Sequence, residues 1–281
     1  MLCIILLSSV LLGFITSNWI FLVFLMEITL FTFLFMLYEY MVLSYTTPAV
    51  KYFFSQTLGG ILLLLAGLFF NFLLSKGDGL LGMYFLLSGL CMKLGAFPMH
   101  FWVVPTSTEL PFFMLGVLGV PMKMLPLLLL SQFCTYYPSL TLFYGLLTLG
   151  CLSMISGMLL GLANSTLRGI LGASSITHSG WFFFAAPSKV LGSYFFLYGF
   201  TLLLGLSSLM FMSYWLSAAS LIALAGLPPF GVFFGKLFIL LSFYQLSFPL
   251  GFMIPALLSS VLSLIFYLKF SFCLLMSGKW F

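Results

Sequence analysis

Long apolar segments separated by short polar connections occupy almost the whole chain. Runs of this length, about 20 residues without alternation, are typical of membrane-spanning helices and not of spanning strands. The short connections carry turn residues, as in Lys76-Gly77-Asp78-Gly79. We therefore expect an all-α, polytopic membrane protein with no soluble domain. Its ten expected spans are residues 2–16, 19–40, 48–73, 79–104, 111–133, 138–161, 166–186, 189–213, 216–245 and 247–275.

Two of these spans are longer than the rest and contain helix-breaking residues. The fourth is interrupted near Gly95 to Pro98, and the ninth at Gly226-Leu227-Pro228-Pro229. Proline cannot donate a backbone hydrogen bond, so a break at membrane depth must lie within protein or beside a watery cavity. The two broken spans are the fourth members of successive sets of five, and repeats with an odd number of spans are inverted. We expect two inverted five-helix repeats, 1–135 and 136–281.

Composition supports a membrane location and excludes several classes of function. The 281 residues are 63% hydrophobic and 5% charged, whereas soluble domains are roughly 25% charged. The net charge of +5 is dispersed, so nucleic acid is excluded as a partner. The five cysteines lack metal-ligand spacing and are expected to be reduced residues of the apolar core. With no GxGxxG, phosphate loop, haem histidine pair or cysteine cluster, we expect no redox cofactor and no metal in this chain.

Residues near the span ends predict the orientation. The first apolar run lacks the basic start and cleavage site of a signal peptide, so we expect it to be a true span. Basic residues are slightly more frequent on the side of the N-terminus, which favours an inside location for that end. They are Lys51, Arg168 and Lys279 on that side, and Lys76 and Lys189 on the other. Expected interfacial anchors are Trp19, Trp102, Trp215 and Trp280.

Four ionisable residues fall far from any span end: Glu27, Lys93, Lys123 and Lys236. At 1.5 Å per residue, Glu27 lies about 12–14 Å into the second span and Lys123 about 18 Å into the fifth, near the bilayer midplane. Inserting four such charges costs on the order of 10–14 kcal/mol. One interpretation is a proton relay. Burial favours the neutral form of a lysine and a neighbouring carboxylate favours the protonated form, so a buried lysine can bind and release a proton. The alternative is a set of structural ion pairs between helices. We expect Lys93, Lys123 and Lys236 to lie at nearly one depth and to face the bundle interior and not lipid.

The remaining polar candidates have more than one interpretation. His100 and His178 could each shuttle a proton near neutral pH, or could be structural histidines with hydrogen bonds. Hydroxyl groups surround His178 in the sequence, from Ser174 to Ser179. Lys269, near the end of the last span, could extend its amine to the interface. Solvated span ends are expected for Lys76, Asp78, Arg168, Lys189 and Lys279.

Seven stretches of this sequence resemble the antiporter-like membrane subunits of respiratory complex I, the NADH:ubiquinone oxidoreductase. They follow one another in the order found in that family and cover most of the chain. They are FLMEITLFTFL (24–34), KYFFSQTLGGILLLLAGL (51–68), MKLGAFPMHFWVVP (92–105), PMKMLPLLLL (121–130), LRGILGASSITHSGWFF (167–183), SLIALAGLPPFGVFFGKLFIL (220–240) and IFYLKF (265–270). The chain starts directly at the first repeat, as the shortened animal members do. It departs from many relatives in stopping soon after IFYLKF, where they add a final helix.

The resemblance implies a function and a site. It implies proton translocation along a midplane relay of Glu27 with Lys93, then Lys123, then Lys236, with His100 and His178 beside it. NADH, FMN, iron–sulfur clusters and ubiquinone would be bound by other subunits. Expected partners are the neighbouring antiporter-like chain 4, the small chain 4L, accessory subunits and lipids such as cardiolipin. The expected location is the mitochondrial inner membrane, with both termini on the matrix side.

Two alternative functions stay open at this point. A stand-alone cation/proton antiporter would share the fold, and a spacer between pump modules would move no proton. The shortness of the chain favours a complex I subunit over the stand-alone antiporter. Four midplane ionisable residues argue against the spacer.

Overall fold

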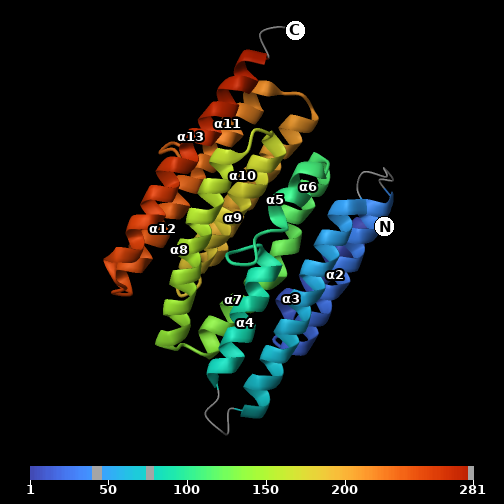
Figure 1. Ribbon diagram of the computed structural model, residues 1–281, viewed down its shortest axis with the longest axis vertical. Coiled ribbons are helices and arrows are strands. Elements are labelled where there is room, and N and C mark those ends of the chain that lie inside the picture. The colour runs from blue at the N-terminus through green and yellow to red at the C-terminus, as the bar shows by residue number, and fades with distance from the viewer. Residues whose placement is uncertain (40–45, 74–78, 278–281) are drawn as a thin grey trace.

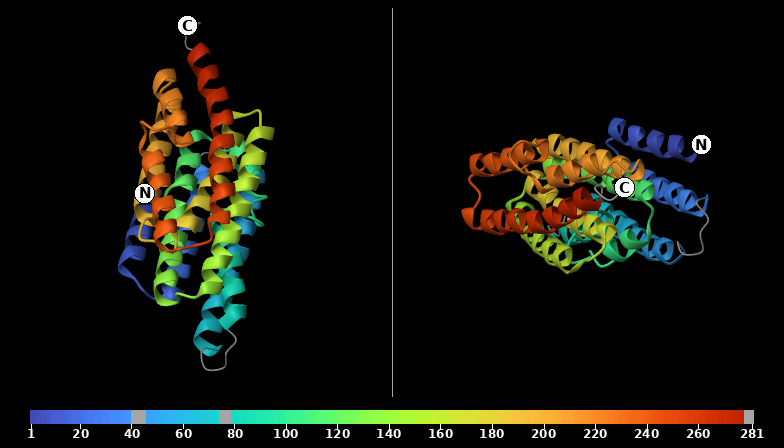
Figure 2. Two further views of the ribbon diagram at one scale, coloured as in Figure 1. Left: turned by 90° about the vertical axis from the view of Figure 1, so that its left-hand side faces the viewer. Right: turned by 90° about the horizontal axis from the view of Figure 1, so that it is seen from above.

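The computed structural model describes residues 1–39, 46–73 and 79–277, and this part of the chain forms helices and no strand. The helices run roughly side by side along one direction (Figure 1). In both Figure 1 and the view from above in Figure 2, the first helices lie at one end of the bundle and the last helices at the other. The expected all-α architecture is confirmed.

The first seven helices occupy the N-terminal half of the chain. They are α1 (Leu2–Ile15), α2 (Trp19–Glu39), α3 (Thr46–Leu73), α4 (Gly79–Leu94), α5 (Val103–Glu109), α6 (Phe112–Gly119) and α7 (Pro121–Tyr136). The C-terminal half holds α8 (Leu140–Ala163), α9 (Leu167–Ala185), α10 (Leu191–Met210), α11 (Tyr214–Ala225), α12 (Gly231–Gln245), a 3₁₀ turn (Leu250–Phe252) and α13 (Met253–Ser277). The expected repeat boundary, 135/136, falls at the end of α7, while the inverted relation of the halves stays a prediction.

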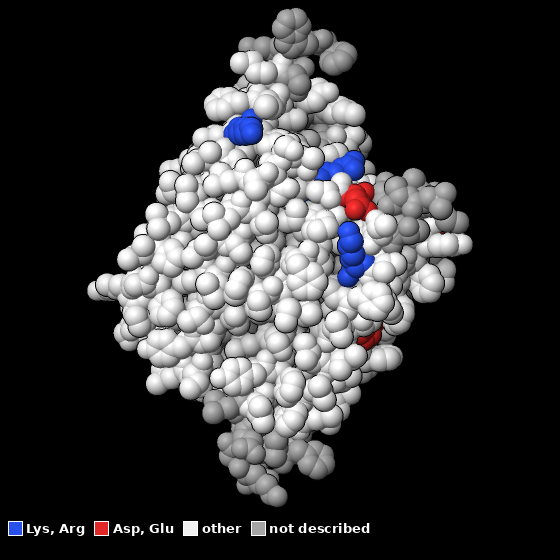
Figure 3. All heavy atoms as spheres, viewed as in Figure 1, with Lys and Arg blue, Asp and Glu red and all other residues white. Residues whose placement is uncertain are grey.

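Apolar helices of membrane-spanning length support a multi-pass membrane protein. In the described part of the chain, six helical stretches are long and apolar enough to cross a bilayer. They are Trp19–Glu39, Thr47–Phe70, Phe112–Tyr136, Leu140–Ala163, Leu191–Met210 and Leu250–Met276. The molecular face in Figure 3 is mostly uncharged, with a few Lys, Arg, Asp and Glu side chains on it. Such a face suits contact with lipid or with other apolar subunits.

Both predicted helix breaks are present. The first separates α4 from α5, and the second separates α11 from α12. Gly95 and Gly226 begin these breaks with φ angles of +69° and +86°. Glycine has no Cβ and adopts this left-handed conformation without strain, which makes it the preferred residue just after a helix end.

Two sequence expectations about this region are wrong, and a third is borne out with a difference. The segment from 106 to 109 belongs to α5 and not to a connection, and its Thr106 and Ser107 are buried. The expected fifth span is present as the apolar stretch Phe112–Tyr136, but it is divided at Val120 into α6 and α7, and Pro121 occupies the first turn of α7, where its missing N–H is tolerated. Trp102 is not an interfacial anchor: it is 3% exposed and donates its Nε1–H to the carbonyl of Met92 at 3.2 Å. It thus satisfies a carbonyl near the helix break.

The inner helix α9 is packed closely against α8. Every residue of α9 from Gly169 to Ala185 is buried. A Cβ at Gly180 would lie 2.7 Å from the Gly150 carbonyl oxygen, and one at Gly157 would lie 2.7 Å from the Thr177 nitrogen. Small residues at such crossings let helix backbones approach each other, which is how helices associate in membranes. The approach fixes α9, and with it His178, in the centre of the bundle.

Candidate functional site

The predicted pairing of Glu27 with Lys93 is confirmed. Lys93 Nζ on α4 donates to Glu27 Oε1 on α2 at 2.8 Å. The lysine side chain is 3% exposed and the glutamate side chain 28% exposed. Each charge would be costly alone in this apolar bundle, and pairing with hydrogen-bond geometry offsets part of that cost. The pair joins two helices that are 66 residues apart in the chain.

Gly60 of α3 makes room for this ion pair, and the sequence analysis did not identify it. A Cβ at Gly60 would overlap Glu27 Oε1 and would lie 3.5 Å from Lys93 Nζ. The neighbouring Gly59 lies against Met92 and the Lys93 stem in the same way. The sequence signal was the adjacent glycines inside an apolar span, because glycine pairs in membrane helices mark close contacts.

Lys123 lies in the first turn of α7 and is 3% exposed. Its Nζ donates to the backbone carbonyl of Ser175, in the middle of α9, at 3.1 Å. Among the described residues, no carboxylate lies within ion-pair distance of this amine. A buried lysine whose partner is a neutral carbonyl keeps its proton less securely than one paired with a carboxylate. The expectation that Lys123 faces the interior and not lipid is confirmed.

Lys236 uses a carbonyl released by the second helix break. Its Nζ donates to the oxygen of Ala225, the last residue of α11, at 2.9 Å. The same amine lies 5.6 Å from the ring centroid of Trp181, close enough for a cation–π contact. Lys236 is 7% exposed, so it too faces the interior. The common depth expected for the three lysines stays a prediction.

His178 forms part of a buried aromatic cluster that the sequence analysis did not predict. Its Nδ1 lies 2.7 Å from the hydroxyl of Tyr194, and its ring centroid lies 4.5 Å from that of Tyr198. The histidine and both tyrosines are 2% exposed or less. Lys123 contacts the Ser175 carbonyl and Lys236 contacts the Trp181 ring, so the two amines meet α9 three residues before and three residues after His178. Tyr194 and Tyr198 come from α10, one helical turn apart, a spacing that gives no signal by itself.

His100 lies in the break between α4 and α5 and is separate from this cluster. Its ring stacks on Phe97 with centroids 5.8 Å apart and an angle of 23°. No hydrogen bond or ion pair of the described residues joins His100 to Glu27 or to the three lysines. Its role in a relay stays a prediction.

The cysteines and the residues at span ends match the sequence expectations only in part. All five cysteines are free, but Cys3 and Cys273 are exposed, so only Cys91, Cys134 and Cys151 are residues of the core. The described residues contain no group of three His, Cys, Asp or Glu side chains that could hold a metal ion. Arg168 was expected to be solvated, yet it is half-buried with its guanidinium 4.9 Å from the Phe112 ring centroid. Lys76, Asp78, Lys279 and Trp280 lie outside the described residues.

The sequence of this chain matches a known protein family. Residues 16–213 match the family described as "NADH:quinone oxidoreductase/Mrp antiporter, TM", which is more than half of the chain. The chain belongs to this family. It is therefore an antiporter-like membrane subunit, and the resemblance noted in the sequence is confirmed.

Curated members of the NADH:quinone oxidoreductase/Mrp antiporter family align with most of the chain. NADH-ubiquinone oxidoreductase chain 2 of Albinaria caerulea is 33% identical over 268 residues, covering 94% of this chain and 85% of that protein. Chain 2 of Branchiostoma lanceolatum is 32% identical over 259 residues, with coverage of 82% and 72%. Chain 2 of Lumbricus terrestris is 28% identical over 286 residues, with coverage of 94% and 83%.

Two solved structures share the fold of this chain at low sequence identity. A chain of respiratory complex I from Thermus thermophilus superposes with a TM-score of 0.81 at 20% identity, covering 92% of this chain. A chain of the Mrp complex from Dietzia superposes with a TM-score of 0.81 at 14% identity, covering 95%. This chain spans 66% and 59% of the length of those two chains. The likeness extends the antiporter fold across both halves of the bundle.

Proposed function

We propose that this chain is a proton-translocating subunit in the membrane arm of a respiratory NADH:ubiquinone oxidoreductase. The observation that carries the proposal is a contrast among three buried lysines. Lys93 is paired with the carboxylate of Glu27, whereas Lys123 and Lys236 donate to backbone carbonyls. A proton relay needs a series of sites that differ in proton affinity. In addition, four ionisable residues in an apolar bundle have a large insertion cost, which a structural role alone rarely requires.

The ion pair supplies a means of control. While Glu27 contacts Lys93, the carboxylate stabilises the protonated amine. Separation of the pair would leave the amine buried without a counter-charge, and the lysine would then release its proton more readily. The relay therefore runs from Lys93 to Lys123 and then to Lys236, with water molecules bridging the amines during transfer.

His178 is the proposed connection between Lys123 and Lys236. An imidazole can accept a proton on one nitrogen and release it from the other, which suits a position in α9 between the contacts of the two amines. His100, in the first helix break, would serve on the side of Lys93. In this proposal both histidines pass protons or order water and bind no metal.

The proposed assembly follows from the chain 2 relatives. NADH, FMN, iron–sulfur clusters and ubiquinone would be bound by other subunits, and quinone reduction there would drive the relay here. The partners would include the antiporter-like chain 4, the small chain 4L and accessory subunits. The chain would lie in the mitochondrial inner membrane with both termini on the matrix side.

Two alternatives make different predictions about the same residues. A stand-alone cation/proton antiporter would be purified without NADH-oxidising partners. If the chain were a non-pumping spacer, the assembled enzyme would pump normally even when the ion pair was removed. The family also contains Mrp antiporter subunits, so the first alternative is the stronger of the two.

Lys93→Met in the assembled enzyme, reconstituted into vesicles, tests the proposal. We expect protons pumped per NADH oxidised to fall while the assembly persists, because methionine keeps the apolar stem and removes the titrating amine. Lys51→Met is the matched control, since Lys51 is exposed on α3. An unchanged ratio in an assembled Lys93→Met enzyme would contradict the relay and favour the spacer.

A further inference from the structure

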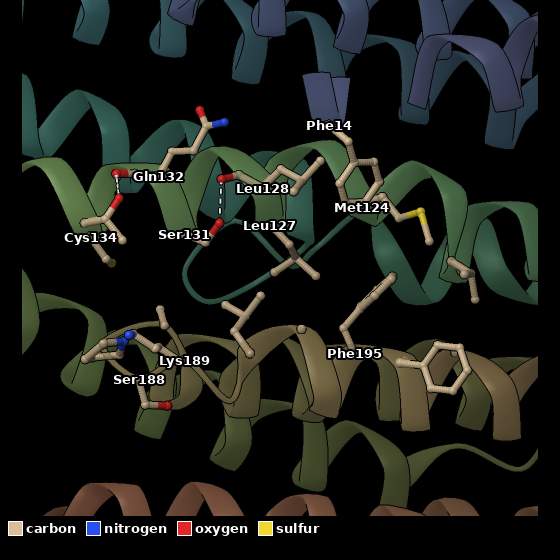
Figure 4. Close-up of a pocket in the computed structure, with 18 of the residues that line it drawn as sticks. Phe14, Met124, Leu127, Leu128, Ser131, Gln132, Cys134, Ser188, Lys189 and Phe195 are labelled. Carbon is tan, nitrogen blue, oxygen red and sulfur yellow. Dashed lines mark hydrogen bonds between the residues drawn. The ribbon is translucent and has the colours of Figure 1, made fainter. Parts of the chain in front are cut away.

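An apolar groove lies between α7 and α10, and none of the four proposed relay residues is among those that line it. It has a volume of about 860 Å³ and is lined mainly by side chains of these two helices, with Phe14 of α1 at one edge. Figure 4 shows α7 and α10 facing each other across it. Ser131, Ser188 and Lys189 gather at one end, while Met124 and Phe195 lie further along.

The groove exists because α6 and α7 are separate helices. At the α6 end, Leu202 and Gly199 of α10 pack onto Gly119 and Val120. Val120 stands between α6 and α7 with φ −118° and ψ −74°, and α7 begins at Pro121. At Gly192 of α10, a Cβ would meet no heavy atom within 4 Å. The groove is therefore a wedge that is closed at Val120 and open toward Lys189.

The chemistry of the groove changes along its length. Lys189 is the only charged residue among those that line it, and it precedes the N-terminus of α10, whose helix dipole adds a partial positive charge. The hydroxyls of Ser131, Thr135 and Ser188 donate to carbonyls of their own chain segments, so they leave few free donors for a ligand. The closed part is lined by Leu, Phe, Met and Val. The groove thus offers one positive end and an otherwise apolar wall.

Its length matches one leaflet of a bilayer. The groove extends along α10 from Lys189, just before the helix, to Leu203, which is about 21 Å at 1.5 Å per helical residue. Half of the hydrocarbon layer of a bilayer is roughly 15 Å thick, so the groove is long enough for one leaflet. A spanning helix of a partner would need a surface of about 30 Å. The closed end at Val120 stops a ligand near the depth of Lys123.

We propose that this groove binds an anionic phospholipid, with the phosphate at Lys189 and an acyl chain along α7 and α10 toward Val120. The positive end selects the headgroup charge, because a lysine near the membrane surface attracts anionic lipids. The apolar wedge accepts the chain, because it has the length of one leaflet and few free hydrogen-bond donors. The bound lipid fills the space that α7 and α10 leave between the two halves of the chain.

Photo-crosslinking of the full chain in its purified membrane assembly tests this site. The probes are phosphatidylglycerol and phosphatidylcholine, each with a diazirine near the end of one acyl chain. We expect phosphatidylglycerol to label groove residues such as Met124 and Phe195. We expect Lys189→Gln to lower that labelling about fivefold, the effect of about 1 kcal/mol per lysine near anionic headgroups. Labelling by phosphatidylcholine should change little.

Gly192→Phe tests the acyl position independently of charge. The added ring would enter the open groove without a clash and should abolish labelling by both lipids. Gly251→Phe is the matched control, because a Cβ at Gly251 also meets no heavy atom within 4 Å and Gly251 is not part of the groove. Lys51→Gln is the control for charge. Equal labelling by the two lipids with no effect of Lys189→Gln, or crosslinking of another protein chain inside the groove, would overturn the proposal.

Discussion

The hydroxyl of Tyr194 lies 2.7 Å from Nδ1 of His178, with both side chains buried in the centre of the bundle. The contact joins α9 to α10 and restrains the imidazole ring. Since the two ring nitrogens of histidine have different roles, the partner of one nitrogen determines what the other can do. If the hydroxyl donates to Nδ1, the proton of the neutral imidazole is on Nε2. Tyr194 is thus a positioning residue for the proposed connection between Lys123 and Lys236.

We therefore expect Tyr194→Phe to reduce the number of protons pumped per NADH oxidised, with a smaller effect on the amount of assembled enzyme. The substitution keeps the ring that packs on Phe182 and removes only the hydroxyl, at a stability cost of about 1–3 kcal/mol for the unsatisfied histidine nitrogen. The measurement is protons pumped per NADH oxidised across a pH series, because loss of the restraint should also shift the pH profile. Tyr244→Phe, at an exposed tyrosine, is the control. A normal ratio and an unchanged pH profile would show that Tyr194 has only a packing role.

The side chain at 123 separates a relay from a structural ion contact. Lys123→Arg keeps the charge but fixes the proton, since a guanidinium does not deprotonate in proteins. Lys123→Met removes the titrating group and keeps the length. In a relay both variants lose pumping, and electron transfer slows with it where coupling is tight. In a structural role arginine is tolerated and methionine is destabilising. Full pumping by reconstituted Lys123→Arg enzyme would exclude Lys123 from the relay.

Gly60→Ala should disrupt the Glu27–Lys93 pair without altering either partner. The new methyl group would overlap the carboxylate of Glu27, so the pair must shift or separate, with an overpacking cost of about 1–3 kcal/mol. We expect reduced pumping and lower thermal stability. Gly192→Ala, where a Cβ meets nothing, provides the control for adding a methyl group in a helix. Wild-type pumping by Gly60→Ala would mean that the ion pair tolerates displacement.

The two left-handed glycines provide a matched comparison. Alanine at Gly95 or Gly226 places a Cβ in a strained conformation, at about 1–2 kcal/mol each. At Gly226 the Cβ would also lie 3.1 Å from Lys236 Nζ, whereas at Gly95 it would overlap Val103. Both variants should unfold at lower temperature, and Gly226→Ala alone should displace Lys236 from the Ala225 carbonyl. Equal displacement of Lys236 in a structure of each variant would refute this assignment.

Local chemistry determined much of this protein from the sequence by itself. Continuous apolar segments predict helices because the bilayer offers no partner for free backbone groups. Gly95 and Gly226, each followed by proline, predicted both breaks. The Glu27–Lys93 pairing was also predictable, because opposite charges far from any span end stabilise each other when they meet. Each of these features follows from the chemistry of individual side chains and from their placement in a bilayer.

Tertiary structure decided which neighbours complete the site. Pro121 divides a span whereas Pro126 remains inside α7, although both lie in the same apolar run. Trp102 supports a helix break, yet its sequence context resembles that of an interfacial anchor. The partners of Lys123 and Lys236 are the backbone carbonyls of Ser175 and Ala225. Every residue has a backbone carbonyl, so the sequence could not indicate which residues would supply these two. Gly60 and Tyr194 contact site residues that belong to neighbouring helices. Such contacts depend on helix crossings, which a periodic apolar pattern leaves undetermined because lipid and protein interior are equally apolar.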